Sequence, residues 1–223
     1  MTFSLIARCT RTGQFGMAIA SSSPAVAARC AHVRAGVGVV ASQNITDPGF
    51  GPELLDQLAQ GKSASDALLA VTTGRQFIDY RQLLVLGATG PCAIHSGAQV
   101  LGNWGEARGN DCAAGGNLLA NTGVPQAMVT GFESATGHLG DRLMAALQAG
   151  LAEGGEAGPV HSAGMKIADK LDWPLVDLRI DWSDDPIGAL AQAWDIYRPQ
   201  MSAYVQRAIN PSIAPSYGVP GDE

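Results

Sequence analysis

Residues 2–22 read TFSLIARCTRTGQFGMAIASS and contain the first recognisable structural motif of the chain. Residues 2–8 alternate polar and apolar side chains at their start, and Thr12-Gly13 supplies a turn before the small apolar run that begins at Phe15. Two short apolar runs joined by a glycine-containing turn are typical of a β-hairpin. The sequence therefore predicts a hairpin whose first strand begins at residue 2.

After this hairpin, residues 33–43 are predicted to form a third strand. It lacks alternation of polar and apolar residues, so we expect both of its faces to be buried. Two helices follow with no strand between them. The first begins near Pro52 and ends at Gly61, and the second begins after a serine cap at Ser63 or Ser65 and ends at Gly74.

The second half of the chain repeats this order of strands and then helices. Thr89-Gly90 separates two further strands, and residues 101–121, rich in Gly and Asn, read as a long loop. Helices are predicted near 124–136 and 138–153, strands near 162–169 and 175–182, and a last helix over about 186–208.

Antiparallel hairpins with helices gathered in pairs predict an α+β fold rather than a doubly wound sheet. The natural arrangement is a four-layer αββα sandwich, in which two mainly antiparallel sheets are each covered by a helix pair. We expect a single domain over residues 1–209, followed by an extended Pro-rich tail over residues 210–223.

The amino-acid composition indicates how large a core the chain can bury and whether it associates with a second copy. The chain has 223 residues, of which 46% are hydrophobic, so it can bury a sizeable core. Only 15% are charged, against roughly 25% in an average globular protein, which favours a buried subunit interface and a homodimer. The last predicted helix adds a stripe of apolar side chains that serves either such a dimer or ordinary core packing, namely Trp194, Tyr197, Met201 and Tyr204.

Several classes of function are disfavoured. The net charge is −6 and no basic cluster is present, so we expect no nucleic-acid partner. Apolar runs are too short to cross a membrane, and no signal peptide is apparent, so we expect a cytoplasmic protein. The four cysteines form no CxxC pair and the histidines lack ligand spacing, so we expect neither a metal nor another cofactor.

Thr2 is the most informative residue for a possible catalytic mechanism. Removal of Met1, which a small second residue permits, would place a free α-amine beside the Thr2 hydroxyl at the start of a strand. An α-amine has a pKa of roughly 7.7–8.0, so it can serve as the base for its own hydroxyl. The alternative is that Thr2 is an ordinary second residue, as in many proteins.

The chain resembles the bacterial family catalogued as domain of unknown function 1028, over nearly its whole length to about residue 190. The resemblance rests on the opening TFSLIAR, FGMAIAS, VRAGVGVVASQN, Asn44-x-Thr46-Asp47-Pro48-Gly49-Phe50-Gly51, His95-Ser96-Gly97, Trp104-Gly105 and Gly116-Asn117-Leu118-Leu119. It implies the αββα fold of N-terminal nucleophile hydrolases, and it supplies no substrate.

In the related hydrolases, donors for the oxyanion lie between the third strand and the first helix. Gln43 and Asn44 occupy that junction and would suit the role, although Asn44 could instead cap the loop. Such hydrolases also often place a cation near the amine. The candidates are Arg29, His32 and Arg34, each of which could equally be a surface residue, and a lysine is absent there.

Three further residues complete the candidate site. His95 ends a predicted strand and is either an acid–base group or a satisfied core histidine. Asn117 lies in the long Gly-rich segment, which we interpret as a wall or lid of the pocket. Trp104 in the same segment would give that pocket an apolar face.

Two hypotheses follow. In the first, the chain hydrolyses a C–N bond of a small amide, peptide or ureido compound, with Thr2 as nucleophile. In the second, it is a catalytically silent ligand-binding or assembly protein on the same fold, because a fold does not determine a function.

Overall fold

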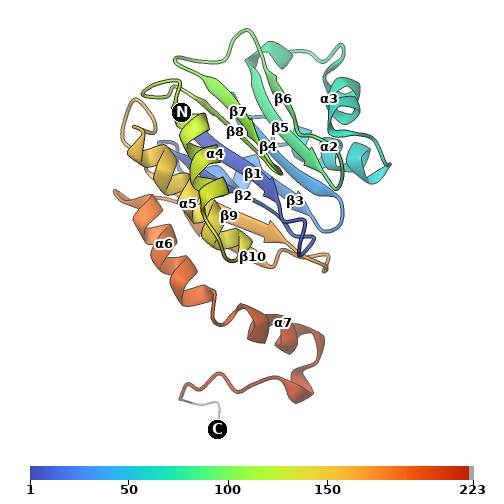
Figure 1. The fold of residues 1–223 in the computed structure, drawn as a ribbon, viewed down its shortest axis with the longest axis vertical. Coiled ribbons are helices and arrows are strands. Elements are labelled where there is room, and N and C mark those ends of the chain that lie inside the picture. The colour runs from blue at the N-terminus through green and yellow to red at the C-terminus, as the bar shows by residue number, and fades with distance from the viewer. Residues whose placement is uncertain (221–223) are drawn as a thin grey trace.

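Two stacked antiparallel sheets form the centre of the computed structural model, which describes residues 1–220 (Figure 1). The larger sheet has the strand order β10 (Val176–Ile180), β9 (Ser162–Ala168), β2 (Phe15–Ser21), β1 (Thr2–Arg8), β8 (Cys112–Asn117) and β7 (Gly105–Gly109). The smaller sheet has the order β3 (Ala31–Arg34), β4 (Gly38–Asn44), β5 (Arg81–Gly87) and β6 (Ala93–Ser96).

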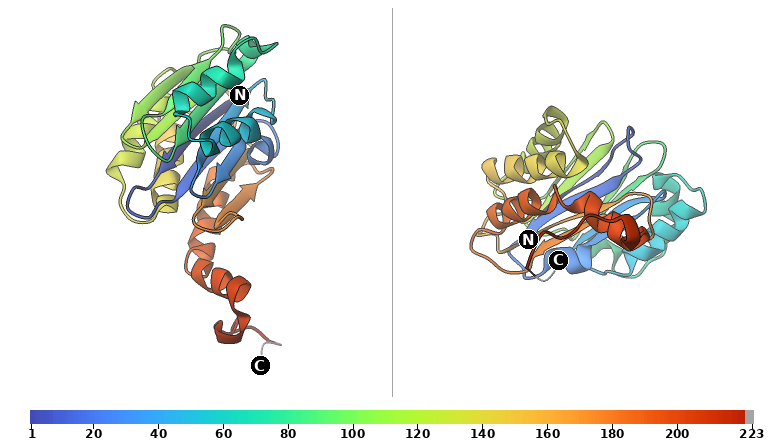
Figure 2. Two further views of the ribbon diagram at one scale, coloured as in Figure 1. Left: turned by 90° about the vertical axis from the view of Figure 1, so that its right-hand side faces the viewer. Right: turned by 90° about the horizontal axis from the view of Figure 1, so that it is seen from below.

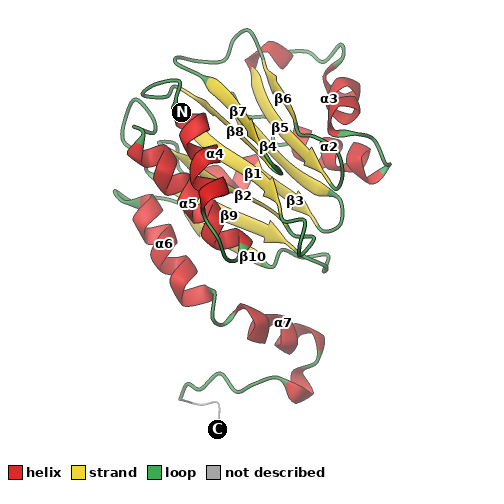
Figure 3. Cartoon of the chain, viewed as in Figure 1, coloured by secondary structure: helices red, strands yellow, loops and turns green. Residues whose placement is uncertain are grey.

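Helix pairs cover the outer faces of both sheets. Helices α4 (Val124–Ser134) and α5 (Leu139–Ala152) pack on the larger sheet, and α2 (Phe50–Ala59) and α3 (Ala64–Thr72) pack on the smaller one (Figures 2 and 3). The short helices α1 (Val26–Cys30) and η1 (Ile78–Tyr80) lie in connections. The predicted αββα sandwich is therefore confirmed.

Strand β1 is buried on both of its faces and divides its side chains between two layers. Phe3 and Leu5 pack towards α4 and α5, whereas Ile6 packs between the sheets with Met17 and Leu84. This division follows from the two-residue period of a strand. A third apolar layer, which includes Phe50, lies between the smaller sheet and its helices.

Two parts of the predicted topology are wrong. Residues 33–43 form no single strand, because β3 and β4 pair as a hairpin around a turn in which Gly36 has φ +69°. The predicted loop over residues 101–121 contains β7 and β8, and β8 pairs directly with β1. A Cβ on Gly116 of β8 would lie 2.7 Å from Leu119 and 3.0 Å from the Thr2 carbonyl oxygen, so this glycine marks close packing within the sheet.

The last predicted helix is broken into α6 (Pro186–Tyr197) and α7 (Met201–Ile209), since Pro199 cannot continue a helix. Trp194 of α6 is 2% exposed and belongs to the core, whereas α7 has no buried residue and projects away from the sandwich (Figures 1 and 2). The helical turn η2 (Pro211–Ile213) follows. Of the predicted tail over residues 210–223, residues 221–223 lie outside the described part.

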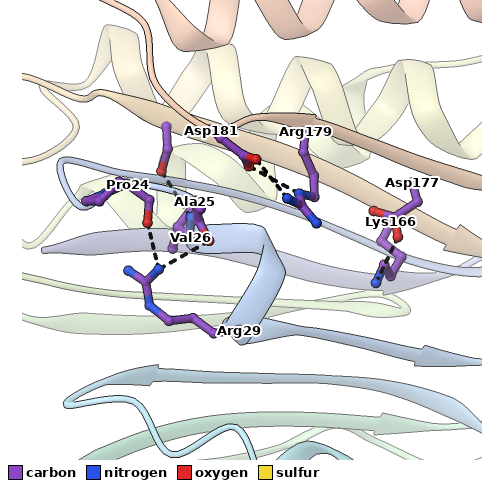
Figure 4. Close-up of polar contacts among 9 residues, drawn as sticks. Pro24, Ala25, Val26, Arg29, Lys166, Asp177, Arg179 and Asp181 are labelled. Carbon is purple, nitrogen blue, oxygen red and sulfur yellow. Dashed lines mark hydrogen bonds and ion pairs between the residues drawn. The ribbon is translucent and has the colours of Figure 1, made fainter.

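Both edges of the larger sheet carry exposed charge. Glu106 and Arg108 alternate along β7, and Asp177 and Arg179 alternate along β10. In β10, Asp177 pairs with Lys166 at 3.0 Å and Arg179 pairs with Asp181 at 2.7 Å (Figure 4). Within residues 1–220, no helix is both long and apolar enough to span a bilayer.

Leu84→Ala tests the layer between the sheets. Leu84 is fully buried there, so truncation leaves a cavity, and we expect the free energy of unfolding to fall by about 2–5 kcal/mol in urea denaturation. Leu69→Ala is the matched control. Leu69 is 66% exposed, so its truncation should change stability by less than about 0.5 kcal/mol. Equal losses in the two variants would contradict the assignment of this layer.

Candidate active site

Thr2 is the first residue of β1 and lies directly opposite Asn117 of β8. It is 5% exposed, although it stands one residue from the chain terminus. Its hydroxyl donates a hydrogen bond to the carbonyl oxygen of Met1, and the Ser21 hydroxyl at the end of β2 donates to the same oxygen. Two hydroxyl groups therefore converge on the peptide bond that precedes Thr2.

A group of serines follows Ser21 and fixes the chain around it. The Ser21 Oγ accepts the backbone N–H of Ser23 at 3.0 Å, and the Ser162 hydroxyl donates to the Ser23 carbonyl at 2.6 Å. Ser162 also accepts the N–H of Val26 at 3.2 Å, which ties the start of α1 to β9. Ser21 and Ser162 are both fully buried, so this end of β2 is held rigidly.

Glu156 brings a buried carboxyl group to the same place. Both of its oxygens accept the Ser22 backbone N–H at 3.1 Å, and the residue is 4% exposed. Burial raises its pKa to about 7, although the Ser22 hydrogen bond, the terminal amine and His161 oppose that rise. This buried carboxyl group lies near enough to the terminal amine for the amine's charge to act on its pKa.

Below Thr2, a chain of buried amides links the sheets. The Ser4 hydroxyl donates to Gln43 Oε1 at 2.6 Å, and Gln43 Nε2 donates to Gln82 Oε1 at 2.8 Å. Gln82 Nε2 lies 3.1 Å from Ser96 Oγ and 3.3 Å from the Gly116 carbonyl oxygen, and Asn117 Nδ2 lies 3.4 Å from Gln82 Oε1. Gln43 and Asn117 are therefore brought close to Thr2, Gln43 as part of this network and Asn117 at its edge.

Asn44 holds two loops at the end of β4. Its Nδ2 donates to the Tyr80 carbonyl at 2.6 Å, and its Oδ1 accepts the Leu101 N–H at 3.3 Å. Its φ of +72° is a left-handed conformation that asparagine tolerates better than most residues. The Leu101 carbonyl in turn accepts the Leu118 N–H, so the loop that carries the 41% exposed Trp104 lies beside the segment that follows Asn117.

Three further predicted residues bond other partners than Thr2 in the structure. Arg29 on α1 donates to the Pro24 carbonyl at 2.6 Å and to the Ala25 carbonyl at 3.2 Å (Figure 4). Arg34 pairs with Asp56 of α2 at 2.8 Å. His95 lies in β6, opposite Leu83 of β5, on the outer face of the smaller sheet that α3 covers. Its Nε2 is 3.1 Å from the Ile78 carbonyl oxygen.

Sequence reasoning missed Ser21 and Glu156. Ser21 opens the run Ser21-Ser22-Ser23 at the end of a strand, and that run is a visible signal. Glu156 stands in a Gly-rich connection with nothing to distinguish it from a surface carboxylate. The described residues hold no cluster of three or more His, Cys, Asp or Glu side chains that could bind a metal ion.

The fold and this terminus define a four-layer αββα protein with a buried hydroxyl at the start of a central strand. Residues 2–190 match the family described as "Family of unknown function (DUF1028)", and the chain belongs to that family. No protein among those with curated descriptions matches it.

Solved structures provide two comparisons. The crystal structure of protein SPO2555 from Silicibacter pomeroyi, of the same family, is 32% identical, covers 88% of each chain and has a TM-score of 0.81. Anbu (ancestral beta-subunit) from Yersinia bercovieri is 12% identical and has a TM-score of 0.38, with 92% of this chain and 97% of that chain covered.

Glu156→Gln tests the electrostatics of the site. Folding raises the pKa of this carboxyl group from 4.5 to about 7, so the folded chain keeps a proton that the unfolded chain has released. Stability from this group is therefore lost as the pH rises from about 4.5 to about 7. We expect the variant to gain stability relative to the wild type over that range, measured by urea denaturation at several pH values.

Glu153→Gln is the control, because Glu153 is an exposed carboxyl group on the same connection. Its stability should follow the wild-type pH profile. A Glu156→Gln profile parallel to that of the wild type would show that burial does not perturb this group.

Proposed function

We propose that this protein is a hydrolase of a C–N bond in a small amide, peptide or ureido compound, with Thr2 as nucleophile once Met1 has been removed. One observation carries the proposal. The Thr2 hydroxyl is buried at the start of a central strand and bonded to the Met1 carbonyl, a partner that departs with Met1. The αββα fold, which the family resemblance associates with N-terminal nucleophile hydrolases, supports it.

In the proposed mechanism, Thr2 Oγ attacks the substrate carbonyl carbon while the Thr2 α-amine accepts the hydroxyl proton. The amine then returns that proton to the leaving nitrogen as the C–N bond breaks, which leaves an ester on Thr2. Water attacks the ester by the same route and releases the acid. Each step moves one proton between the amine and the reacting atoms, so no cofactor is needed.

Three neighbours would support these steps. Ser21, freed from the Met1 carbonyl, would hydrogen-bond the new amine and orient it. Glu156 would adjust the protonation of that amine from its buried position. Asn117, opposite Thr2, would supply an amide donor for the oxyanion, because a fixed neutral donor requires no reorganisation as charge develops.

We also propose a cytoplasmic location for this enzyme. All four cysteines, Cys9, Cys30, Cys92 and Cys112, are free thiols in the structure. Unpaired thiols suit a reducing compartment.

Mass spectrometry of two preparations tests the nucleophile. The chain that begins at Thr2 should form a stoichiometric ester with a β-lactone at Thr2, whereas the chain that retains Met1 should not. Thr2→Ser should keep the adduct because it keeps a hydroxyl. Thr2→Ala should lose it and should lose amide turnover by at least about a thousandfold. If the chain that begins at Thr2 binds ligands but forms no adduct and shows no turnover, the result would favour a catalytically silent ligand-binding protein.

We propose, in addition, that two copies associate through the arm formed by α7 and η2. The arm exposes three large apolar side chains, namely Tyr204, Ile209 and Ile213. Burial of such side chains between copies is favourable at about 25 cal/mol per Å².

Light scattering of Ile209→Asp tests the dimer. We expect twice the 23.0 kDa of one chain for the wild type and a single chain for the variant. Leu69→Asp introduces the same charge on α3 at a comparably exposed residue and should remain dimeric. A monomeric wild type would refute the dimer without bearing on the nucleophile.

A further inference from the structure

A polar cavity lies at the opposite end of β1 from Thr2. It has a volume of about 440 Å³, is open to solvent, and is bordered by the β1–β2 turn, the β7–β8 turn and the α4–α5 connection. Arg8, the first lining residue, lies six residues along β1 from Thr2, which corresponds to about 20 Å along an extended strand. The candidate active site does not include any of its lining residues.

Three arginines line this cavity against two carboxylates, and both carboxylates are already engaged. Asp111 pairs with Arg8 at 2.8 Å. Glu133 accepts the backbone N–H of Asn110 at 2.6 Å. The lining therefore carries one net positive charge, and no ion pair within residues 1–220 occupies Arg11 or Arg142.

The donors of Arg11 and Arg142 remain largely unused. Arg142 lies over the ring of Phe132 with its guanidinium carbon 3.8 Å from the ring centre, and only its Nε has an acceptor, the Phe132 carbonyl at 3.3 Å. The Arg11 side chain has no hydrogen bond or ion pair with any residue in the described part of the chain. Two guanidinium groups thus face one cavity with free N–H donors.

Cys9 lines the cavity beside Arg11. Burial raises the pKa of the Cys9 thiol, but hydrogen bonds from the Thr12 side chain and from the backbone N–H groups of Thr12 and Arg11 outweigh it, with help from the Arg11 charge. The net pKa is lowered.

We propose that this cavity binds a small molecule through a carboxylate or phosphate group held between the Arg11 and Arg142 guanidinium groups. Guanidinium groups match both oxyanions geometrically and bind them by charge-assisted hydrogen bonds. The volume lies within the range of about 300–1,000 Å³ typical of small-molecule sites. The site is independent of the function proposed for Thr2, because it uses none of the same residues.

The Cys9 thiol provides a reporter inside the cavity. Iodoacetate and iodoacetamide alkylate the same sulfur by displacing iodide, but only iodoacetate carries a carboxylate. We expect the ratio of the iodoacetate rate to the iodoacetamide rate to be higher at Cys9 than at Cys92. Peptide mass spectrometry measures the alkylation of each cysteine separately. Inorganic phosphate and succinate should each be added separately, and the one that protects Cys9 at lower concentration identifies the preferred group.

Arg11→Gln and Arg142→Gln should each weaken this protection by about tenfold, since each removes a charge-assisted hydrogen bond. Arg11 is exposed, so its variant should fold normally. Arg34→Gln removes the same charge at an exposed ion pair outside the cavity and should leave protection unchanged. Absence of saturable protection by either anion, or equal protection in the wild type and Arg11→Gln, would overturn the proposal.

Discussion

The placement of the two sheets depends on one chain of buried hydrogen bonds, from Ser4 through Gln43 to Gln82. The apolar side chains around it have no directional preference, because the hydrophobic effect depends on area alone. A buried amide left without a partner costs about 1–3 kcal/mol, so only one lateral placement of the sheets satisfies all these groups. The polar chain therefore selects one arrangement from the many that apolar packing would allow.

The position of Thr2 follows from that arrangement. Ser4 is two residues along β1 from Thr2 and points to the same face of the strand, and Gln82 contacts both Gly116 and Asn117 of the neighbouring β8. The network thus controls the register between β1 and β8 at the end where Thr2 lies. Small residues in β8 are required there because Gly115 lies against Leu84 and Gly116 against Leu119.

The sequence was sufficient to predict the hairpin, the helix pairs and the four layers, because those elements show clear periodicity and turn signals. The sequence did not predict β8. Its residues CAAGGN show no polar–apolar alternation because both faces of the strand are buried, and its glycines are typical of a loop. The break between α6 and α7 was detectable, because Pro199 is visible in the sequence.

The candidate site was predictable only in part, for a related reason. Thr2 stands out by its place in the chain, and Asn117 by the motif around it. Glu156 reaches Ser22 across more than a hundred residues of sequence, and no local pattern reports such a contact. His95 was predicted as a site residue but lies on the outer face of the smaller sheet. The sequence of a four-residue strand does not show which of its residues face the helices.

The charged edges of the larger sheet limit how copies of this chain can meet. An edge strand offers unpaired N–H and C=O groups to any other strand, and inserted charges oppose that addition. Glu106 and Arg108 on β7, and Asp177 and Arg179 on β10, alternate along the two edges. Growth of a continuous sheet from molecule to molecule, the route to fibrous aggregates, is therefore disfavoured at both ends.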